Sequence, residues 1–136
     1  MRFKYLVFSL LLTFGILATA QAQDVIRYRN GQEKVRKVVD VWDKVDFRGD
    51  SQQIIAYWIR YKSADGMVRA SLSDEIERIE LKDPELVIRF VKPDALSPAN
   101  LIWVYDLSGN LLHEFNSSGD FKKEYPVFSS TLSGFD

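Results

Sequence analysis

The sequence predicts an all-β protein, either a single small antiparallel sandwich or a partly open barrel built from hairpins. Short runs rich in Val, Ile, Tyr, Phe and Trp recur along the chain, and these residues suit half-buried, pleated strands. Turn residues separate the runs at the close spacing that is typical of sandwiches and barrels. No long amphipathic helical period interrupts them, so we expect at most one helical turn, near residues 72–77.

The N-terminal segment, residues 1–22, has the three parts of a secretory signal peptide. Arg2 and Lys4 precede an uncharged apolar run, and small residues follow it at Ala20 and Ala22. A positive flank, an apolar run and small residues at the cleavage site define such a leader, and the run is shorter than the roughly 20 residues that a membrane anchor needs. We therefore expect cleavage after Ala22 or Ala20, a periplasmic or secreted product, and no membrane span after cleavage.

The remaining residues, 23–136, are expected to form one β-rich domain. They make up 114 of the 136 residues, which is enough for one compact core. Two of the 18 basic residues lie in the leader, so 16 basic residues remain against 19 acidic ones, a net charge of −3. That balance gives no reason to expect nucleic acid as a partner. Because cysteine is absent, burial must stabilise the domain without disulfides.

The first predicted hairpin comes directly after the leader. Residues 25–29 and 33–41 flank Asn30-Gly31, a dipeptide that accepts the positive φ angles of a tight turn. A turn near residues 43–44 is then expected to lead into a short strand over residues 45–47. These segments have the length and composition of strands that pair through tight turns.

A second hairpin is predicted around the longest β-like run, residues 52–62. The tripeptide Arg48-Gly49-Asp50 precedes it; it matches an integrin-binding motif, but glycine and aspartate also form tight turns, and we interpret it as a turn. Ala64-Asp65-Gly66 turns the run into residues 67–70. Alternation along the run assigns one side to the core. The expected core residues are Ile55, Tyr57, Ile59 and Tyr61.

Further strands follow a short ambiguous segment over residues 71–79. Ser71 and Asp74 have the spacing of a capping box, so we expect one helical turn there, followed by a strand over 78–81 that ends at Asp83-Pro84. The remaining predicted strands cover residues 85–91, 100–107, 110–115 and 121–128. Residues 92–100, with two prolines, form the longest break and the only candidate sub-boundary; residues 129–136 are expected to fray.

Five elements of residues 24–81 occur in a fixed order. These are Val25-Ile26, Asn30-Gly31, the valines at 35, 38 and 39, Val45-Asp46-Phe47, and the closing segment Ser73 to Ile79. Together they resemble a small SH3-like or Sm-like β module that is frequent in exported proteins of Bacteroidota. The resemblance implies a curled sheet of short strands. Arg36-Lys37 stands where such modules usually carry a glycine.

A second resemblance involves residues 102–112. This segment is similar to a hairpin in the C-terminal sorting domains of type IX secretion cargo. Those domains continue into a Gly-x-Tyr strand and a basic terminus, whereas this sequence ends in Gly134-Phe135-Asp136. No sorting function is therefore expected.

The residue types that usually carry catalysis are scarce. Cysteine is absent and His113 is the single histidine, so a serine triad would need His113 as its base. Alternation assigns His113 to one face with Leu111 and Phe115, which favours a packing role. A hydrolase would require His113 in a cleft beside a serine or a carboxylate. We expect no enzymatic activity and no cofactor.

Metal binding is also not expected. One histidine and no thiols leave only carboxylates to complete a zinc site. Asp40, Asp43, Asp46 and Asp50 could in principle gather oxygens around calcium, but they lack the Asp-x-Asp-x-Asp-Gly pattern, and large aromatic residues interrupt them. We interpret these residues as solvated strand ends and turns.

Basic and aromatic residues provide the candidate binding surface. Basic residues cluster on the first hairpin, and Arg60 and Lys62 extend the cluster if the second hairpin packs beside it. Trp58 shares a face of its strand with these two residues, and exposed rings beside polar groups anchor proteins or stack on sugars. A solvated outer face or a buried core would also explain these residues. The candidate binding residues are Arg27, Arg29, Arg36, Trp58, Arg60, Lys62, Trp103 and Tyr105.

These observations favour an exported module that acts by binding. The first hypothesis is that its edge strands and basic-aromatic face contact another envelope or extracellular protein. The alternative is a glycan-binding module that uses Trp58 and Trp103. Burial of both tryptophans would remove the alternative.

Overall fold

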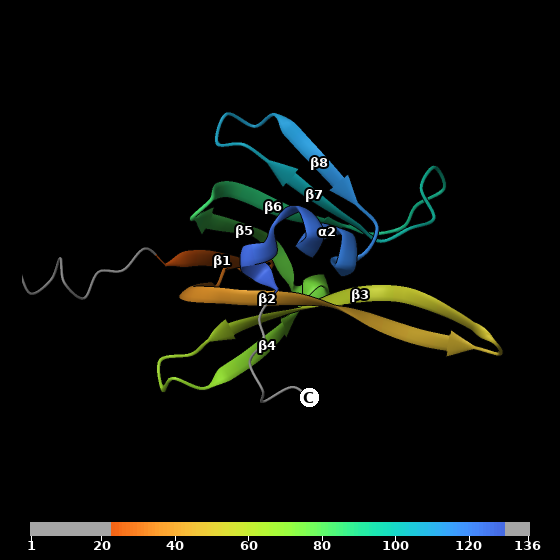
Figure 1. The fold of residues 1–136 in the computed structure, drawn as a ribbon, viewed down its shortest axis with the longest axis horizontal. Coiled ribbons are helices and arrows are strands. Elements are labelled where there is room, and N and C mark those ends of the chain that lie inside the picture. The colour runs from red at the N-terminus through yellow and green to blue at the C-terminus, as the bar shows by residue number, and fades with distance from the viewer. Residues whose placement is uncertain (1–22, 130–136) are drawn as a thin grey trace, which may run out of the picture.

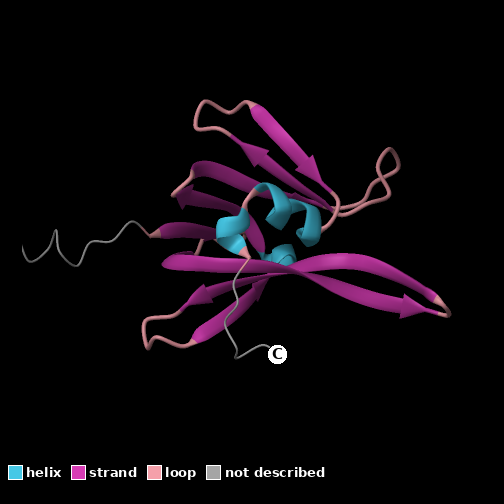
Figure 2. Ribbon diagram, viewed as in Figure 1, coloured by secondary structure: helices cyan, strands magenta, loops and turns pink. Residues whose placement is uncertain are grey.

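The computed structural model describes residues 23–129, in which eight antiparallel strands form one sheet that does not close (Figure 1). The predicted signal peptide lies outside the described residues. The strands are β1 (Asp24–Tyr28), β2 (Glu33–Arg48), β3 (Ser51–Lys62), β4 (Val68–Leu72), β5 (Ile76–Lys82), β6 (Glu85–Val91), β7 (Leu101–Tyr105) and β8 (Leu111–Phe115). Helical elements are short: η1 (Ser73–Glu75), α2 (Ser118–Glu124) and η2 (Pro126–Phe128). The prediction of an all-β fold is confirmed, as Figure 2 shows.

The strand order is β4-β3-β2-β1-β5-β6-β7-β8. β1 pairs with both β2 and β5, so the first five strands curl together, and every later strand extends the sheet as a hairpin. The expected helical turn is present as η1, between β4 and β5. Among the described residues, no helix is long and apolar enough to cross a membrane.

The prediction of a turn near residues 43–44 is wrong, because β2 continues from Glu33 to Arg48 as one long strand. Its register against β3 shifts between Lys44 and Val45, and also between Val38 and Asp40. At the first shift the extra residue is Ile55 of β3, because Lys44 pairs with Ala56 and Val45 with Ile54. Such a bulge bends the paired strands without reversing them. The predicted turn at Arg48-Gly49-Asp50 is confirmed, with Gly49 at a φ of 64°.

A C-terminal helix replaces the strand expected over residues 121–128. The Ser117 side chain accepts a hydrogen bond from the Asp120 amide at 3.1 Å and so caps α2, while Lys122 and Lys123 lie in the last turn, where cations complement the helix dipole. Phe121 and Phe128 are both buried. The aromatic residues of this segment therefore follow a helical spacing, which was mistaken for a strand.

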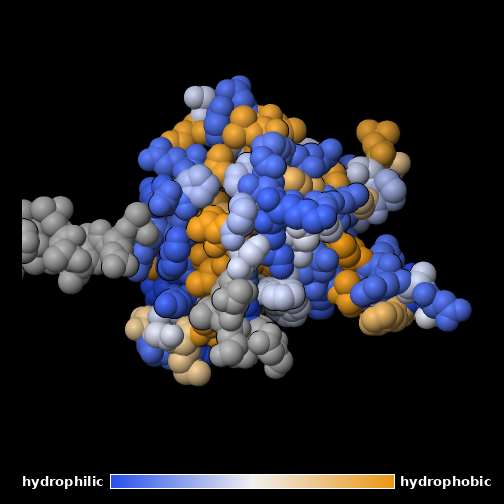
Figure 3. Space-filling model, in the orientation of Figure 1, coloured by the Kyte–Doolittle hydropathy of each residue, from blue (hydrophilic) through white to orange (hydrophobic). Residues whose placement is uncertain are grey.

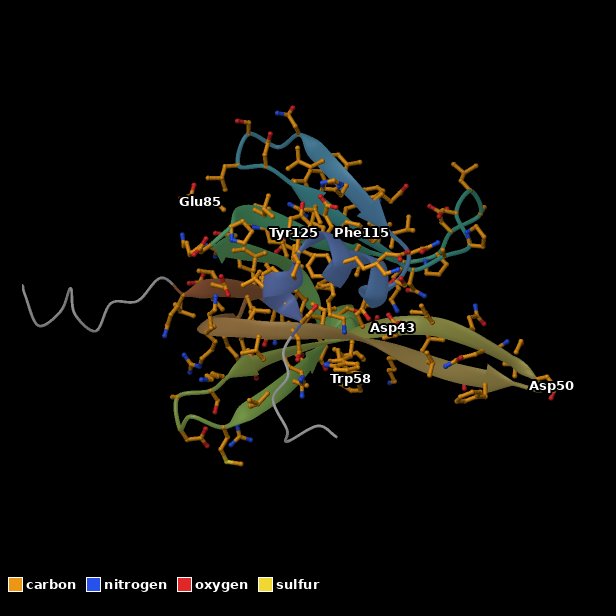
Figure 4. The ribbon with its side chains drawn as sticks, in the orientation of Figure 1. Asp43, Asp50, Trp58, Glu85, Phe115 and Tyr125 are labelled. Atoms are coloured by element: carbon orange, nitrogen blue, oxygen red, sulfur yellow. The ribbon has the colours of Figure 1, made fainter. Side chains whose placement is uncertain are left out.

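The helical segment fills the angle between two arms of the bent sheet. In Figure 1, α2 lies between β2 and β8. Figure 4 shows Phe115 of β8 and Tyr125 beside α2, with their ring centroids 6.3 Å apart. The Ser118 amide donates to Asp43 of β2 at 2.7 Å. One core therefore runs along this face of the sheet. Its principal residues are Ile26, Val41, Tyr57, Ile59, Ile79, Leu81, Ile88, Ile102, Val104, Phe121 and Phe128; Tyr57, Ile59 and Tyr61 are buried as expected, and Ile55 is half-buried.

The loop over residues 92–100, the candidate sub-boundary, packs against the first half of the sheet. The Tyr57 hydroxyl donates to the Asn100 carbonyl at 2.7 Å, and the Asn100 side-chain amide donates to the Ile54 carbonyl at 2.9 Å. The far end of the loop is solvent-exposed: Figure 3 shows its apolar tip, where Leu96 is 95% exposed. The sheet is continuous across this loop through the pairing of β6 with β7.

Candidate functional site

The predicted binding residues do not form one site. Trp58 lies on β3 and Trp103 on β7, and four strands separate these two in the sheet. Arg29 and Lys62 are exposed, and Arg36 is half-buried. Two parts of the outer surface therefore have to be considered separately, one on β2 and β3 and the other on β5, β6 and β7.

The structure corrects the prediction for Arg60. It was predicted to contact a partner, but only 1% of it is exposed. Its guanidinium forms an ion pair with the carboxylate of Asp40, which is also buried. Burying a charge is costly unless it is paired, so this pair belongs to the structure of the sheet. Arg60 is therefore not available to a partner.

Two tryptophans lie opposite each other on β2 and β3. Trp42 is the cross-strand partner of Trp58, and both are partly exposed. Lys122 lies 3.9 Å from the centroid of the Trp42 ring and Lys44 lies 5.2 Å from that of Trp58, so cation–π contacts occupy the rings. In Figure 4 Trp58 lies on the side of β3 away from α2. Trp42 was not among the predicted binding residues, although Trp42 and Lys44 are two residues apart on β2 and therefore lie on the same face of the strand.

The second part of the surface is a groove on β5, β6 and β7, on the side opposite the core. Its side chains lie on the outer face because successive side chains of a strand point to opposite sides of the sheet. Ile88 and Val104 are buried, so their neighbours Arg89 and Tyr105 lie on the outer face. A cavity of about 340 Å³ is lined by Arg78, Val87, Arg89, Tyr105, Asp106, Leu107 and Gly109. An adjacent cavity of about 320 Å³ is also lined by Arg78, Val87 and Leu107. We call this continuous surface the outer groove.

The outer groove combines an apolar wall with the guanidinium of Arg89. Leu107 is 65% exposed, and Tyr105 contacts Trp103 edge to face with their centroids 6.3 Å apart. The Trp103 ring nitrogen donates to Glu114 at 2.9 Å, which fixes the ring. Within residues 23–129, Arg89 forms no ion pair with another side chain. Since guanidinium groups bind carboxylates well, Arg89 can accept an acidic partner.

A carboxylate neutralises the arginines at the other end of the groove. Glu80 accepts hydrogen bonds from Arg27 at 2.5 Å and Arg78 at 2.9 Å. The hydrogen bond from Arg27, with that from Arg78 and the charges of both, outweighs burial and lowers the pKa of Glu80 below its usual value. Arg27 also pairs with Glu33. The predicted residue Arg27 is therefore already engaged, whereas Arg89, which was not predicted, forms no ion pair among residues 23–129.

The turn beside the groove is held rigidly. Asp106 accepts hydrogen bonds from the amides of Ser108 and Asn110, each at 2.9 Å, and from the Asn110 side chain at 2.9 Å. The Asn110 side chain contributes most to lowering the pKa of Asp106. Gly109 has a φ of 90°, which favours glycine. This turn holds Leu107 in position at the edge of the groove.

His113 packs among aromatic rings. It stacks on Phe115 with their centroids 5.6 Å apart, and its Nε2 atom lies 3.5 Å from Glu124. The residues lining the outer groove do not include it. Among the described residues, no group of three His, Asp or Glu side chains could hold a metal ion.

Comparisons with known proteins found no matching family model, no matching curated protein and no matching solved structure.

Proposed function

We propose that this chain is an exported, non-enzymatic module that binds a segment of another envelope or extracellular protein in the outer groove. The observation that carries the proposal is the position of Arg89, a half-buried guanidinium without an ion-pair partner among residues 23–129, beside Tyr105 and Leu107. A matching segment would place an acidic side chain against Arg89 and apolar side chains against Tyr105 and Leu107. Such charge complementarity gives specificity, and aromatic anchors give affinity.

The topology of the first five strands supports the proposed resemblance to SH3-like or Sm-like modules. β1 to β4 follow one another across the sheet, η1 connects β4 to β5, and β5 returns to pair with β1. In this proposal the curl is the scaffold, and β6 and β7 extend it to build the groove. The glycan alternative has less support, because Lys44 lies over the ring of Trp58 and the two tryptophans lie far apart in the sheet order.

Site-specific cross-linking in the native envelope tests this function. In one variant of the chain, benzoylphenylalanine, a photo-cross-linking residue, replaces Leu107 in the groove. In a second variant it replaces Met67, which is 62% exposed on the β3–β4 turn. We expect capture of a defined protein from position 107 only, with a cross-linked peptide that contains acidic and apolar residues. Arg89→Glu should reduce this capture at least about tenfold, the loss expected when a buried ion pair becomes a repulsion.

The control for charge is Arg48→Glu, on the distant β2–β3 hairpin, which should leave capture unchanged. Identical capture from positions 107 and 67 would count against a specific groove. Undiminished capture by Arg89→Glu would do the same.

A further inference from the structure

Four side chains from four strands gather inside the curl of β1 to β4. They are Tyr28, Lys34, Tyr61 and Ser71, here called the lysine–tyrosine cluster. The residue opposite Lys34 in the register is Ile26, and those opposite Tyr61 and Ser71 are Val38 and Ile59. All three partners are buried core residues, so the sheet directs this polar cluster toward its interior.

Direct contacts connect the cluster. The Lys34 ammonium donates a hydrogen bond to the Tyr61 hydroxyl at 2.9 Å, and its nitrogen lies 5.3 Å and 5.2 Å from the ring centroids of Tyr28 and Tyr61. The hydroxyls of Tyr28 and Ser71 are 2.7 Å apart. Tyr28, Tyr61 and Ser71 are each less than a tenth exposed. The cluster is therefore a set of hydrogen-bond donors held close to one half-buried cation.

No carboxylate within residues 23–129 forms a salt bridge with Lys34. The ammonium is stabilised by a phenol and by two ring faces, which compensate a buried charge less completely than an anion does. The hydrogen bond with Tyr61 raises the pKa of Lys34, so its charge persists at neutral pH. A half-buried, charged lysine without a carboxylate partner favours binding of an external anion.

The cluster opens into a cleft of suitable size. The cleft has a volume of about 410 Å³ and is lined by Tyr28, Arg29, Asn30, Gln32, Lys34, Ser71 and Glu75. Small-molecule sites are usually of this order. The Arg29 guanidinium is held at the rim by a hydrogen bond to the Asp74 carbonyl at 3.1 Å. Two cations against the carboxylate of Glu75 leave one excess positive charge, which suits a monoanion.

We infer that the lysine–tyrosine cluster is a binding site for a small organic monocarboxylate. The ligand carboxylate accepts hydrogen bonds from Lys34 and from the one hydroxyl of the Tyr28–Ser71 pair that accepts in their mutual hydrogen bond and so keeps its proton for the ligand. Arg29 lies over the cleft entrance. The remaining space accommodates an uncharged body of a few atoms up to an aromatic ring. The outer groove shares no lining residue with this cleft, so the site is independent of the proposed protein-binding function.

Titration with benzoate, followed by backbone amide NMR shifts of the full chain, tests this inference. Benzamide has nearly the same shape without the charge and is the matched control ligand. We expect saturable shifts at Arg29, Lys34 and Ser71 with benzoate at millimolar concentration, and none with benzamide. Equal shifts with both ligands, or none with benzoate, would overturn the inference.

Matched variants separate the cluster from general surface charge. Lys34→Met should weaken benzoate binding at least about tenfold, since Lys34 supplies the one ammonium among the described residues that line the cleft. Lys62→Met removes an exposed lysine one residue beyond Tyr61 and should leave the affinity unchanged. Tyr28→Phe keeps the ring and removes one hydroxyl, and it should weaken binding severalfold. This variant still tests the site if Lys34→Met does not fold. Equal affinity in Tyr28→Phe and the unmodified protein would contradict the proposed contacts.

Discussion

Arg60 forms an ion pair with Asp40 across β2 and β3, and both side chains are almost completely buried. The Arg60 guanidinium also lies 5.6 Å from the centroid of the Trp42 ring. The buried ion pair and the Trp42 ring therefore pack together on this side of the two strands. A pair of this kind stabilises less through its own attraction than through the large cost of removing one member.

We therefore expect Asp40→Asn to lower the free energy of unfolding by about 3–5 kcal/mol, the cost of leaving a buried charge unpaired. Urea denaturation followed by circular dichroism measures this loss. Asp65→Asn is the control, because the carboxylate of Asp65 pairs with Arg69 on the exposed β3–β4 turn; it should change the stability little. A similar loss in both variants would show that burial of the Asp40 pair has no special importance.

Phe121 should be the most sensitive position of the helical segment. It is buried, and its ring centroid lies 5.6 Å from that of Phe128 and 5.8 Å from that of Phe115. Phe121→Ala leaves a cavity between the arms of the sheet, and we expect a loss of about 3–5 kcal/mol in unfolding free energy. Val127→Ala, at a 57% exposed neighbour, should cost much less. Equal effects in thermal denaturation would contradict the packing of α2 into the core.

The strands were predictable because their side-chain alternation and turn residues are local. Asn30-Gly31 and Asp83-Pro84 both lie at strand ends, as expected. The C-terminal helix was not predicted, since Ser117-Ser118-Gly119 is equally compatible with a turn and with a helix start, and only the core contacts of Phe121 and Phe128 distinguish the two. The turn expected near residues 43–44 was wrong for a similar reason: Asp43 and Lys44 are compatible with a turn and with a strand, and only the pairing of β2 with β3 distinguishes the two.

The candidate site residues were harder to predict than the strands. Trp103 and Tyr105 alternate with the buried residues Ile102 and Val104 and are half-buried. Sequence reasoning could not show that Arg60 is buried, because a charged residue is buried only where tertiary pairing compensates it. Arg89 and Lys34 are half-buried and form no ion pair with a carboxylate among the described residues, and each lines a groove or cleft. That property depends on contacts between distant strands, so no sequence pattern reveals it.

Glu80 should contribute to the acid sensitivity of the fold. Its pKa in the folded protein lies below its ordinary value of 4.5, mainly because Arg27 donates a hydrogen bond to it. A lowered carboxylate pKa gives stability that is present above about pH 4.5 and is lost as the pH falls through the folded pKa. Glu80→Gln should therefore show a smaller loss of stability between neutral and acidic pH, measured by urea denaturation at each pH. Glu85→Gln, at an exposed position, is the control and should follow the unmodified protein.

Tyr61 should ionise at a lower pH than an ordinary tyrosine. Burial alone raises its pKa, but the hydrogen bonds from Lys34 and Ser71 and the charge of Lys34 outweigh burial and lower it. By contrast, burial raises the pKa of Tyr28, Tyr57 and Tyr125. An alkaline titration of phenolate absorbance should show an early component that disappears in Tyr61→Phe.

Lys34→Met should move that component to higher pH, because burial then acts without the compensating cation, whereas Lys62→Met should leave it in place. An early component that survives in Tyr61→Phe would assign the lowered pKa to another tyrosine, and an unchanged titration in Lys34→Met would show that the ammonium does not control it.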